Sequence, residues 1–248
     1  MARNTDESEI PEGRRRYLWL WVLLSGLAAT GITAYLIQKN LDAKNEERFR
    51  EQSFQIERTI NARMEAYIGL LRGGAGLFAA SDEVTLEDFR GFYERLNIPK
   101  YYPGIQGFGF TVRSSPAQTN ALLRQFTELG VKGLRIWPEG NRAEYHTIVY
   151  LEPMDARNTL ALGYDMFSEP TRRKAMERAR DEGTAALSGK VRLVQEGPAA
   201  EHPGFLLYVP VYRGGKIPGT LAERREALAG YVYAPFRAVD LFDAMLRE

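Results

Sequence analysis

The feature that most constrains this chain is an uncharged stretch that runs without interruption over Tyr17–Ile37. It holds about 21 residues, and a helix needs about 20 apolar residues to cross the hydrocarbon core of a bilayer. Three arginines, Arg14–Arg16, precede the stretch, and Lys39 follows it. Clustered arginines favour the cytoplasmic side of a membrane. We therefore expect a transmembrane helix here, a cytoplasmic tail over residues 1–16, and the rest of the chain in the periplasm or outside the cell.

Two other interpretations of this stretch are open. A cleaved signal peptide would use the small residues Ala28 and Ala29, but its apolar region holds about 7–15 residues, and this run continues to Ile37. A buried core helix normally shows a polar face, and the run has none. Trp19 and Trp21 lie near the arginine-bearing end, as in the aromatic belt of a membrane span. The pattern favours the transmembrane interpretation.

The composition excludes several kinds of chemistry. The chain has no cysteine, which rules out disulfides, thiolate nucleophiles and cysteine metal sites. Its formal net charge of +1 gives no electrostatic reason to expect a nucleic-acid partner. The two histidines, His146 and His202, lie far apart in the sequence, and neither has a second histidine at metal-ligand spacing. We therefore expect no metal, no cofactor and no enzymatic serine–histidine set.

A long helix is predicted directly after the apolar stretch, over residues 38–72. The segment has neither glycine nor proline before Gly69, and its later apolar residues recur at steps of three and four, which is the helical period. At 1.5 Å per residue the helix is roughly 50 Å long. It is either a stalk that transmits motion or a spacer and dimer seam. The glycines of Gly73–Gly76 should end this pattern, through close packing or a bend.

The remaining sequence predicts helices and antiparallel strands in irregular alternation, an α+β fold. Ser81 or Thr85 is a candidate cap for the first helix, and Asp88 completes a capping-box pattern with Thr85. Pro170 and Gly183 bound the third helix. No Rossmann or P-loop order is present. The first predicted helix starts at Ser81 or Thr85 and runs to Leu96, and the others cover residues 116–129 and 170–182. The predicted strands cover 105–112, 134–137, 145–151, 191–195, 204–212 and 228–234.

Six blocks of the sequence, taken in order, carry a family resemblance: Phe78–Ser81, Tyr102–Phe110, Tyr145–Pro153, Ala161–Asp165, Arg172–Gly189 and Gly204–Tyr212. They resemble the CHASE domains, which are extracytoplasmic sensor modules of membrane-bound histidine kinases and nucleotide cyclases, including cytokinin receptors. The matches span roughly Leu70–Leu241, nearly all of the exported part. The resemblance implies a sensor domain over residues 73–241, built as two tandem PAS-like antiparallel-sheet modules behind the long helix.

The resemblance also implies a ligand site. In the cytokinin-binding members an aspartate bonds the ligand in the membrane-distal module, and its position matches Asp165, while a leucine that contributes its backbone matches Leu187. The pocket wall would include Tyr145, Ile148 and Tyr150. This chain departs from the family by having Thr147 in place of a proline in that wall.

The residues themselves leave other roles open for these positions. Asp165 sits in an apolar setting, where a carboxylate must be bonded, and it could equally be a cap or turn aspartate ahead of the helix at 170–182. Leu187 could be a core residue, and Tyr145 and Tyr150 could be half-buried core tyrosines. We nevertheless predict that Asp165 and the turn at Leu187 border a pocket of small-molecule size between a sheet and that helix.

The function expected from this reading is a sensory input region that binds an unknown small molecule, forms a homodimer and passes a signal through the membrane. Residues 242–248 resemble the start of a helix that returns to the membrane, so we expect a longer protein with a histidine kinase or cyclic-dinucleotide cyclase as its output. The alternative is a membrane-anchored periplasmic binding or assembly protein without signalling. A ligand can signal only through different affinities for two states of the protein.

Overall fold

The computed structural model describes residues 12–197 and 203–246, and it contains one long helix followed by an α+β domain. The predicted tail at residues 1–11 lies outside the described residues. The chain divides into two compact units, residues 1–59 and 60–248, and each is described by itself. The helices are α1 (Glu12–Ala80), α2 (Leu86–Leu96), α3 (Ile98–Tyr101), α4 (Thr119–Glu128), α5 (Ala156–Thr159), α6 (Pro170–Glu182), α7 (Leu221–Ala227) and α8 (Ala238–Leu246).

The predicted transmembrane and stalk segments belong to one uninterrupted helix, α1. Among the described residues, α1 is long and apolar enough to cross a membrane, and none of its most apolar window is buried. Large apolar side chains such as Trp21 and Tyr35 are 73% and 67% exposed. This exposure does not fit the alternative of a buried core helix, because such a helix covers its apolar side chains.

A single five-stranded antiparallel sheet forms the centre of the domain. Its strands are β1 (Phe108–Ser114), β2 (Tyr145–Glu152), β3 (Ala186–Leu187), β4 (Gly204–Tyr212) and β5 (Leu228–Arg237), in the spatial order β2-β1-β5-β4-β3. This corrects the expectation of two tandem sheets. Strand β5 pairs with both β1 and β4, so the earlier and later strands join in one sheet.

Two predicted strands are reduced to single bridges, which is part of the reason why no second sheet forms among the described residues. Residues 134–137 contribute one bridge, from Trp137 to Tyr164, and residues 191–195 contribute one, from Val191 to Gly204. The second segment then turns into the 3-10 helix η2 (Val194–Glu196). Apolar runs of this length do not form strands unless a neighbouring strand supplies hydrogen-bond partners along them.

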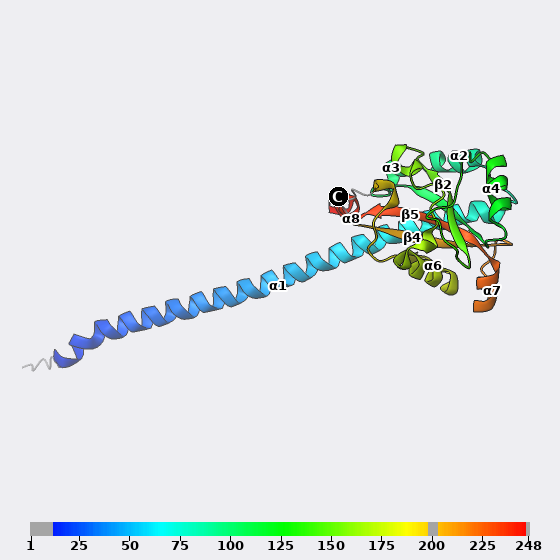
Figure 1. Ribbon diagram of the computed structural model, residues 1–248. Helices are drawn as coiled ribbons and strands as arrows, with labels where there is room; N and C mark the ends of the chain where they lie inside the picture. The colour runs from blue at the N-terminus through cyan, green and yellow to red at the C-terminus, as the bar shows by residue number, and fades with distance from the viewer. Residues whose placement is uncertain (1–11, 198–202, 247–248) are drawn as a thin grey trace, which may run out of the picture. The chain divides into compact units, whose positions relative to one another are not determined.

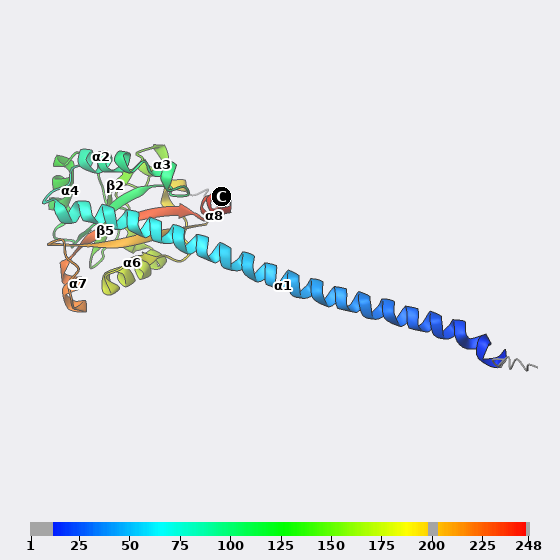
Figure 2. The same ribbon diagram turned by 180° about the vertical axis from the view of Figure 1, so that it is seen from behind.

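Helices cover both faces of the sheet (Figure 1). The side chains of the sheet alternate between two apolar cores. The last turns of α1, together with α2 and α4, cover one face (Figure 2), while α6 covers the other. Alternation is the normal consequence of the two-residue period of a strand. Along β4, for example, Leu207 and Val209 belong to the α1 side, and Leu206 and Tyr208 belong to the α6 side.

Helix boundaries follow the capping residues closely. Helix α2 begins after Thr85, whose side chain accepts a hydrogen bond from the Asp88 amide in a complete capping box. Helix α6 ends at Gly183, which has φ 69°, a left-handed conformation that glycine adopts without steric cost. The structure thus selects Thr85 over Ser81 as the cap of α2 and confirms the predicted end of α6. Helix α8 confirms a helix near the end of the described chain, and its return to the membrane stays a prediction. Helix α7 was not predicted.

The glycines at Gly73–Gly76 do not end α1, which continues to Ala80. A Cβ atom at Gly74 would lie 2.5 Å from Cζ of Phe108 and 3.0 Å from a methyl carbon of Val232, whereas one at Gly73 would meet nothing. Close packing, one of the two roles proposed for these glycines, is therefore the one observed. Gly74 lets the helix backbone approach the sheet directly over β1 and β5.

Candidate functional site

Asp165 ends a short backbone segment that lies between β2 and the bridge residue Trp137. On one side, the Ile148 amide donates to the Tyr164 carbonyl at 3.0 Å, and the Gly163 amide donates to the Ile148 carbonyl at 2.9 Å. On the other side, the Asp165 amide donates to the Trp137 carbonyl at 2.7 Å. The segment thus extends the sheet beyond β2 by a few residues and fixes the position of the Asp165 side chain.

The Asp165 carboxylate is completely buried and is bonded by the backbone. Its Oδ1 accepts hydrogen bonds from the amides of His146 at 2.8 Å and Phe167 at 3.1 Å. Its Oδ2 lies 3.4 Å from Nε of Arg142. The aspartate therefore caps the 3-10 helix η1 (Met166–Ser168) directly ahead of α6. The turn-aspartate interpretation is confirmed, and these bonds account for a carboxylate in apolar surroundings.

The structure brings only some of the other predicted site residues near Asp165. Ile148 is buried in the core on the α6 side, and Tyr145 is half-buried with its hydroxyl donating to the Gly140 carbonyl at 2.9 Å. Tyr150 lies in the core on the opposite face and donates to the Val84 carbonyl. Leu187 is 39% exposed on β3, at the other edge of the sheet from β2.

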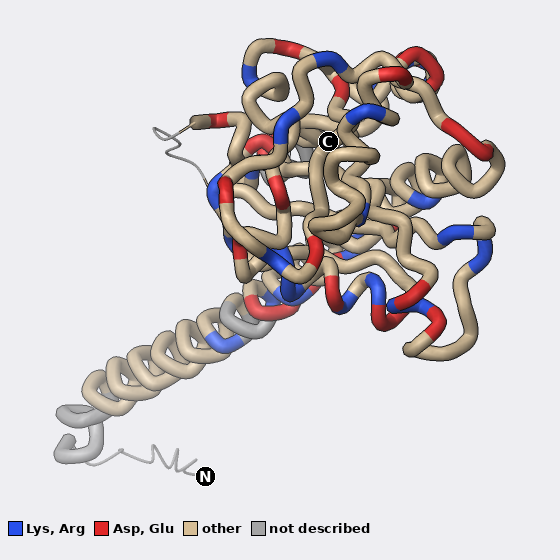
Figure 3. Tube along the Cα trace, turned by 45° about the vertical axis from the view of Figure 1, so that its right-hand side comes forward, with Lys and Arg blue, Asp and Glu red and all other residues tan. Residues whose placement is uncertain are grey.

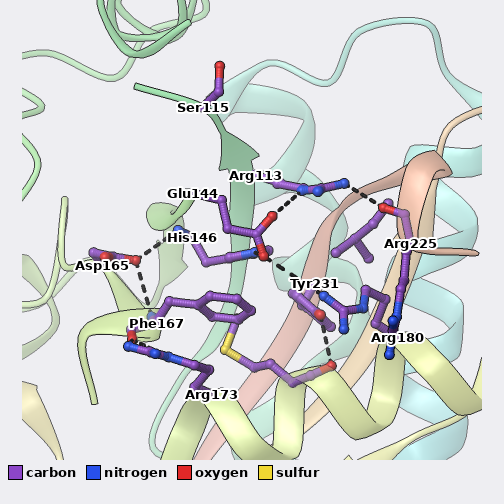
Figure 4. Close-up of polar contacts among 12 residues, drawn as sticks. Arg113, Ser115, Glu144, His146, Asp165, Phe167, Arg173, Arg180, Arg225 and Tyr231 are labelled. Atoms are coloured by element: carbon purple, nitrogen blue, oxygen red, sulfur yellow. Dashed lines mark hydrogen bonds and ion pairs between the residues drawn. The ribbon is translucent and has the colours of Figure 1, made fainter. Parts of the chain in front are cut away.

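A cluster of charged side chains surrounds the single described histidine (Figure 4). Glu144 accepts a hydrogen bond from Nε of Arg113 at 2.7 Å, and its second oxygen lies 3.7 Å from Nε2 of His146 and 3.8 Å from Arg180. The His146 ring is fully buried against the Phe167 ring, with 3.8 Å between centroids. Neither ring nitrogen has a hydrogen-bond partner among the described residues.

Burial and charge shift the pKa values in this cluster in a consistent way. Burial lowers the pKa of His146 below its ordinary 6.5, because the protonated ring would lose its hydration, although the Glu144 and Asp165 carboxylates oppose the shift. The neighbouring His146 ring and the Arg113 guanidinium hold the pKa of the Glu144 carboxyl down to about 2. At neutral pH the cluster therefore holds a neutral histidine and an ionised glutamate.

The stability of the domain should fall as the pH drops below about 6.5. Unfolded His146 takes up a proton near that pH, whereas the folded ring does not, so protonation favours the unfolded chain. We expect a loss of roughly 1 kcal/mol per pH unit well below 6.5, the value for one proton. Glu144 adds a second loss only below its ordinary 4.5, complete near pH 2. Urea denaturation between pH 7.5 and 5 measures the first effect.

The matched variants are His146→Gln and His202→Gln. The first should flatten the pH dependence between pH 6.5 and 5, and the second should leave it as it is in the unmodified chain. Equal slopes for all three proteins would contradict the assignment of this pH dependence to His146.

A cavity of about 560 Å³ lies beside the start of α6, and we name it the α6 cavity. The pocket was predicted between the sheet and the helix at 170–182, whereas no residue of the five strands lines this cavity. Neither Asp165 nor Leu187 lines it. It is lined instead by the residue before Asp165 and by the segment that follows β3. Its lining residues are Trp137, Tyr164, Glu169, Arg172, Lys190, Val191, Arg192, Leu193, Val194 and Gly197.

A second cavity of about 450 Å³ lies at the end of α1, and we name it the α1 cavity. The last residues of α1 and the loop after it, residues 78–84, form one wall. Tyr150, predicted to belong to the ligand pocket, lines this cavity together with Phe110 and Phe126. The block Tyr145–Pro153 thus contributes Tyr150 to the α1 cavity, whereas the block Ala161–Asp165 contributes Tyr164 to the α6 cavity. Among the described residues, no group of three or more histidine or carboxylate side chains is arranged to hold a metal.

Sequence reasoning missed the cavity-lining residues Trp137 and Arg172 as candidates. Arg172 was visible only as the first arginine of a matching pair, and charge on a helix is ordinarily solvated. Arg172 is only 2% exposed because α6 packs against the segment that follows β3, and this packing is not visible in the sequence. Trp137 was assigned to a strand. Only the folded structure shows that it forms an aromatic wall of the cavity with Tyr164, whose ring packs edge-on against it with 4.8 Å between centroids.

Two comparisons with known proteins place the chain. A family model described as "CHASE domain" matches residues 82–248. Hybrid signal transduction histidine kinase A from Dictyostelium discoideum is 25% identical over 119 residues, which cover 46% of this chain and 6% of that protein. The chain therefore spans only a small fraction of that relative's length.

Proposed function

Because the chain belongs to the CHASE domain family, we propose that it is the ligand-sensing input region of a membrane-bound signalling protein. CHASE domains are sensory and not catalytic, which supports an input role in place of an enzymatic one. The observation that carries the proposal furthest is the α6 cavity. Its volume of about 560 Å³ lies within the roughly 300–1,000 Å³ typical of small-molecule sites.

Helix α1 is the element that would carry the signal. It contains the apolar stretch of residues 17–37 and ends at Ala80. Its last residues line the α1 cavity and pack on β1 and β5. A ligand that binds one arrangement of these contacts better than another would shift the population of α1 positions. The antiparallel sheet with helices on both faces would then be one PAS-like sensor module.

The membrane assignment rests on length, exposure and charge. The apolar part of α1 is long enough to cross a bilayer, and the arginines before it favour the cytoplasm. We propose that the sensor domain, residues 73–241, lies in the periplasm of an inner-membrane protein. The relative that matches part of this chain is a histidine kinase by name, which supports a kinase output, and a cyclic-dinucleotide cyclase is the second possibility.

Single-cysteine labelling tests this topology, and the cysteine-free sequence makes it simple. In intact cells a membrane-impermeant maleimide should label Ile217→Cys, because Ile217 is 64% exposed in the sensor domain. Thr5→Cys should react only after the cells are lysed. Labelling of Thr5→Cys in intact cells, with protection of Ile217→Cys, would place the domain in the cytoplasm and contradict the proposal.

A homodimer through the stalk part of α1 is the proposed assembly. The apolar side chains Phe49 and Ile56 are 72% and 49% exposed, and an apolar stripe on a helix needs cover. In membranes, Phe49→Cys should form an intermolecular disulfide, whereas the charged neighbour Arg48→Cys should form less. A small molecule that stabilises the domain should change the crosslinking rate at Phe49→Cys. A crosslinking rate that no such ligand changes would favour the alternative of a binding or assembly protein without signalling.

A further inference from the structure

Arg172 lines the α6 cavity and is a buried cation without a counter-ion in the described part of the chain. Its side chain donates a hydrogen bond, at 2.7 Å, to the Arg192 carbonyl and also interacts with the neutral Tyr208 hydroxyl, and its guanidinium lies over the Tyr164 ring at 5.1 Å. Its Nε is buried without a hydrogen-bond partner. Since arginine remains protonated in proteins, a full positive charge faces this cavity unneutralised.

The acidic residue closest in sequence does not supply the missing charge. Glu169 also lines the cavity, but it caps α6, with one oxygen accepting from the Thr171 amide at 3.0 Å and the other from the Arg172 amide at 2.8 Å. By contrast, the buried Arg180 on the same helix pairs with Asp181 at 2.7 Å. An uncompensated buried charge is costly, so a group from outside the chain is the natural partner of Arg172.

The rest of the lining points to the same chemistry. Lys190 and Arg192 add two cations against the single carboxylate of Glu169. Elsewhere on the domain, charges of both signs are interspersed (Figure 3), so the positive cavity stands out. Trp137 and Tyr164 supply an aromatic wall.

We propose that the α6 cavity binds a small organic anion that carries a flat apolar or aromatic body. The planar guanidinium of Arg172 would hold the carboxylate or a similar anionic group, as its fork of donors is suited to do. The body of the ligand would lie along Trp137 and Tyr164. This inference rests on the proposed sensory function and names the class of ligand for it.

The test compares an anion with its neutral isostere, using the full chain in detergent. Benzoate and benzamide have the same shape, and indole-3-acetate and its amide form a second, larger pair. Trp137 is one of three tryptophans, so replacing Trp19 and Trp21 with phenylalanine makes fluorescence a report from the cavity wall. We expect the anions to change Trp137 fluorescence and to raise Tm, with affinities about 10- to 100-fold above those of the amides, as for bonds to a charged group.

Variants distinguish the buried arginine from general positive charge. Arg172→Met should reduce anion affinity to that of the neutral amide. Arg178→Met is the matched control, because Arg178 lies on the same helix, is exposed and bonds the Leu187 carbonyl. It should leave the affinity unchanged. If Arg172→Met fails to fold, the exposed pair Lys190→Gln with Arg192→Gln should still weaken anion binding by a few fold at low salt, since unpaired surface charges are screened by salt.

Two results would overturn the inference. The first is equal binding of the acid and the amide. The second is anion binding that survives Arg172→Met in a folded protein. If neutral or cationic compounds bind in the cavity instead, the sensory function stands and only the anion assignment fails. If no compound of any charge binds, both fail.

Discussion

Replacing Asp165 with alanine is expected to lower the free energy of unfolding by about 3–5 kcal/mol, the range for removing one partner of a buried charge pair. The variant would leave the amides of His146 and Phe167 buried without an acceptor. It would also remove the carboxylate that faces Arg142 at 3.4 Å. Each unsatisfied buried group costs about 1–3 kcal/mol. Urea denaturation at pH 7.5, followed by Trp137 fluorescence, measures the change.

Asp155→Ala is the matched control for this experiment. Asp155 also caps a short helix and accepts hydrogen bonds from two backbone amides, those of Arg157 and Asn158, but its side chain is 38% exposed. Water can replace it, so we expect a loss of about 1 kcal/mol, as for an ordinary cap. Equal losses for the two variants would show that burial of Asp165 contributes little and would contradict its structural role.

Because Asp165 stabilises the fold, an alanine variant cannot by itself show whether Asp165 contacts a ligand. Both bonds of Oδ1 are internal, so an alanine variant that loses ligand affinity also loses much of its stability. Its predicted role as a ligand contact stays a prediction. Any affinity measured for Asp165→Ala must therefore be compared with the fraction of protein that remains folded.

Replacing Gly163 with alanine is expected to cost at least about 3 kcal/mol, in the upper part of the range for single substitutions. Gly163 has φ +76°, and a Cβ atom there would lie 1.8 Å from the Arg135 carbonyl oxygen. Backbone cannot move aside as a side chain can. The segment from Gly163 to Asp165 would be displaced from β2, and with it Tyr164, which forms a wall of the α6 cavity.

Gly133→Ala is the control that separates the cost of a positive φ from the cost of the steric clash with the Arg135 carbonyl. Gly133 has a similar φ of +70°, but a Cβ atom there meets nothing within 4 Å. It should cost only about 1–2 kcal/mol, the penalty for a left-handed alanine. A Gly163→Ala variant no less stable than Gly133→Ala would show that the segment is not held against Arg135. The Gly163→Ala variant should in addition lose any ligand binding that depends on Tyr164.

Local signals predicted the ends of several elements because each end depends on neighbouring residues. The capping box of Thr85 and Asp88 gave the start of α2, and Pro170 with Gly183 bounded α6. The same pattern was present at Thr220 and Glu223, where a capping box starts α7, and it was overlooked. A short helix in a charged stretch has little apolar period to draw attention to it.

The long-range arrangement was beyond the sequence pattern. Nothing local indicates that β5 pairs with β1 as well as β4, and this pairing decides between one sheet and two. Nothing local shows that β3 forms the edge of the sheet opposite β2. Leu187 on β3 and Ile148 on β2, which were assigned to one pocket, therefore lie on opposite edges. The continuation of α1 past Gly73 likewise depends on Phe108, which contacts the helix only after folding.

The charge of the α6 cavity could not be predicted for a related reason. Arg172 and Arg173 are adjacent in the sequence, yet one lines the cavity and the other donates to the Phe167 carbonyl. Successive residues of a helix point in different directions, and only the tertiary contacts decide which of them is buried. Of the residues that the resemblance named for a ligand site, none lines the α6 cavity, and Tyr150 lines the α1 cavity.

A ligand screen by thermal unfolding tests whether this domain senses a small molecule in the α6 cavity. The full chain in detergent is heated with each member of a metabolite library that spans anionic, neutral and cationic compounds. Val194→Trp, which places a large side chain on the wall of the cavity, is tested alongside. We predict that at least one compound raises Tm in a concentration-dependent way, as binding to the folded state requires, and that Val194→Trp abolishes the shift. A library without a single stabilising compound, or a shift that Val194→Trp leaves intact, would contradict the account.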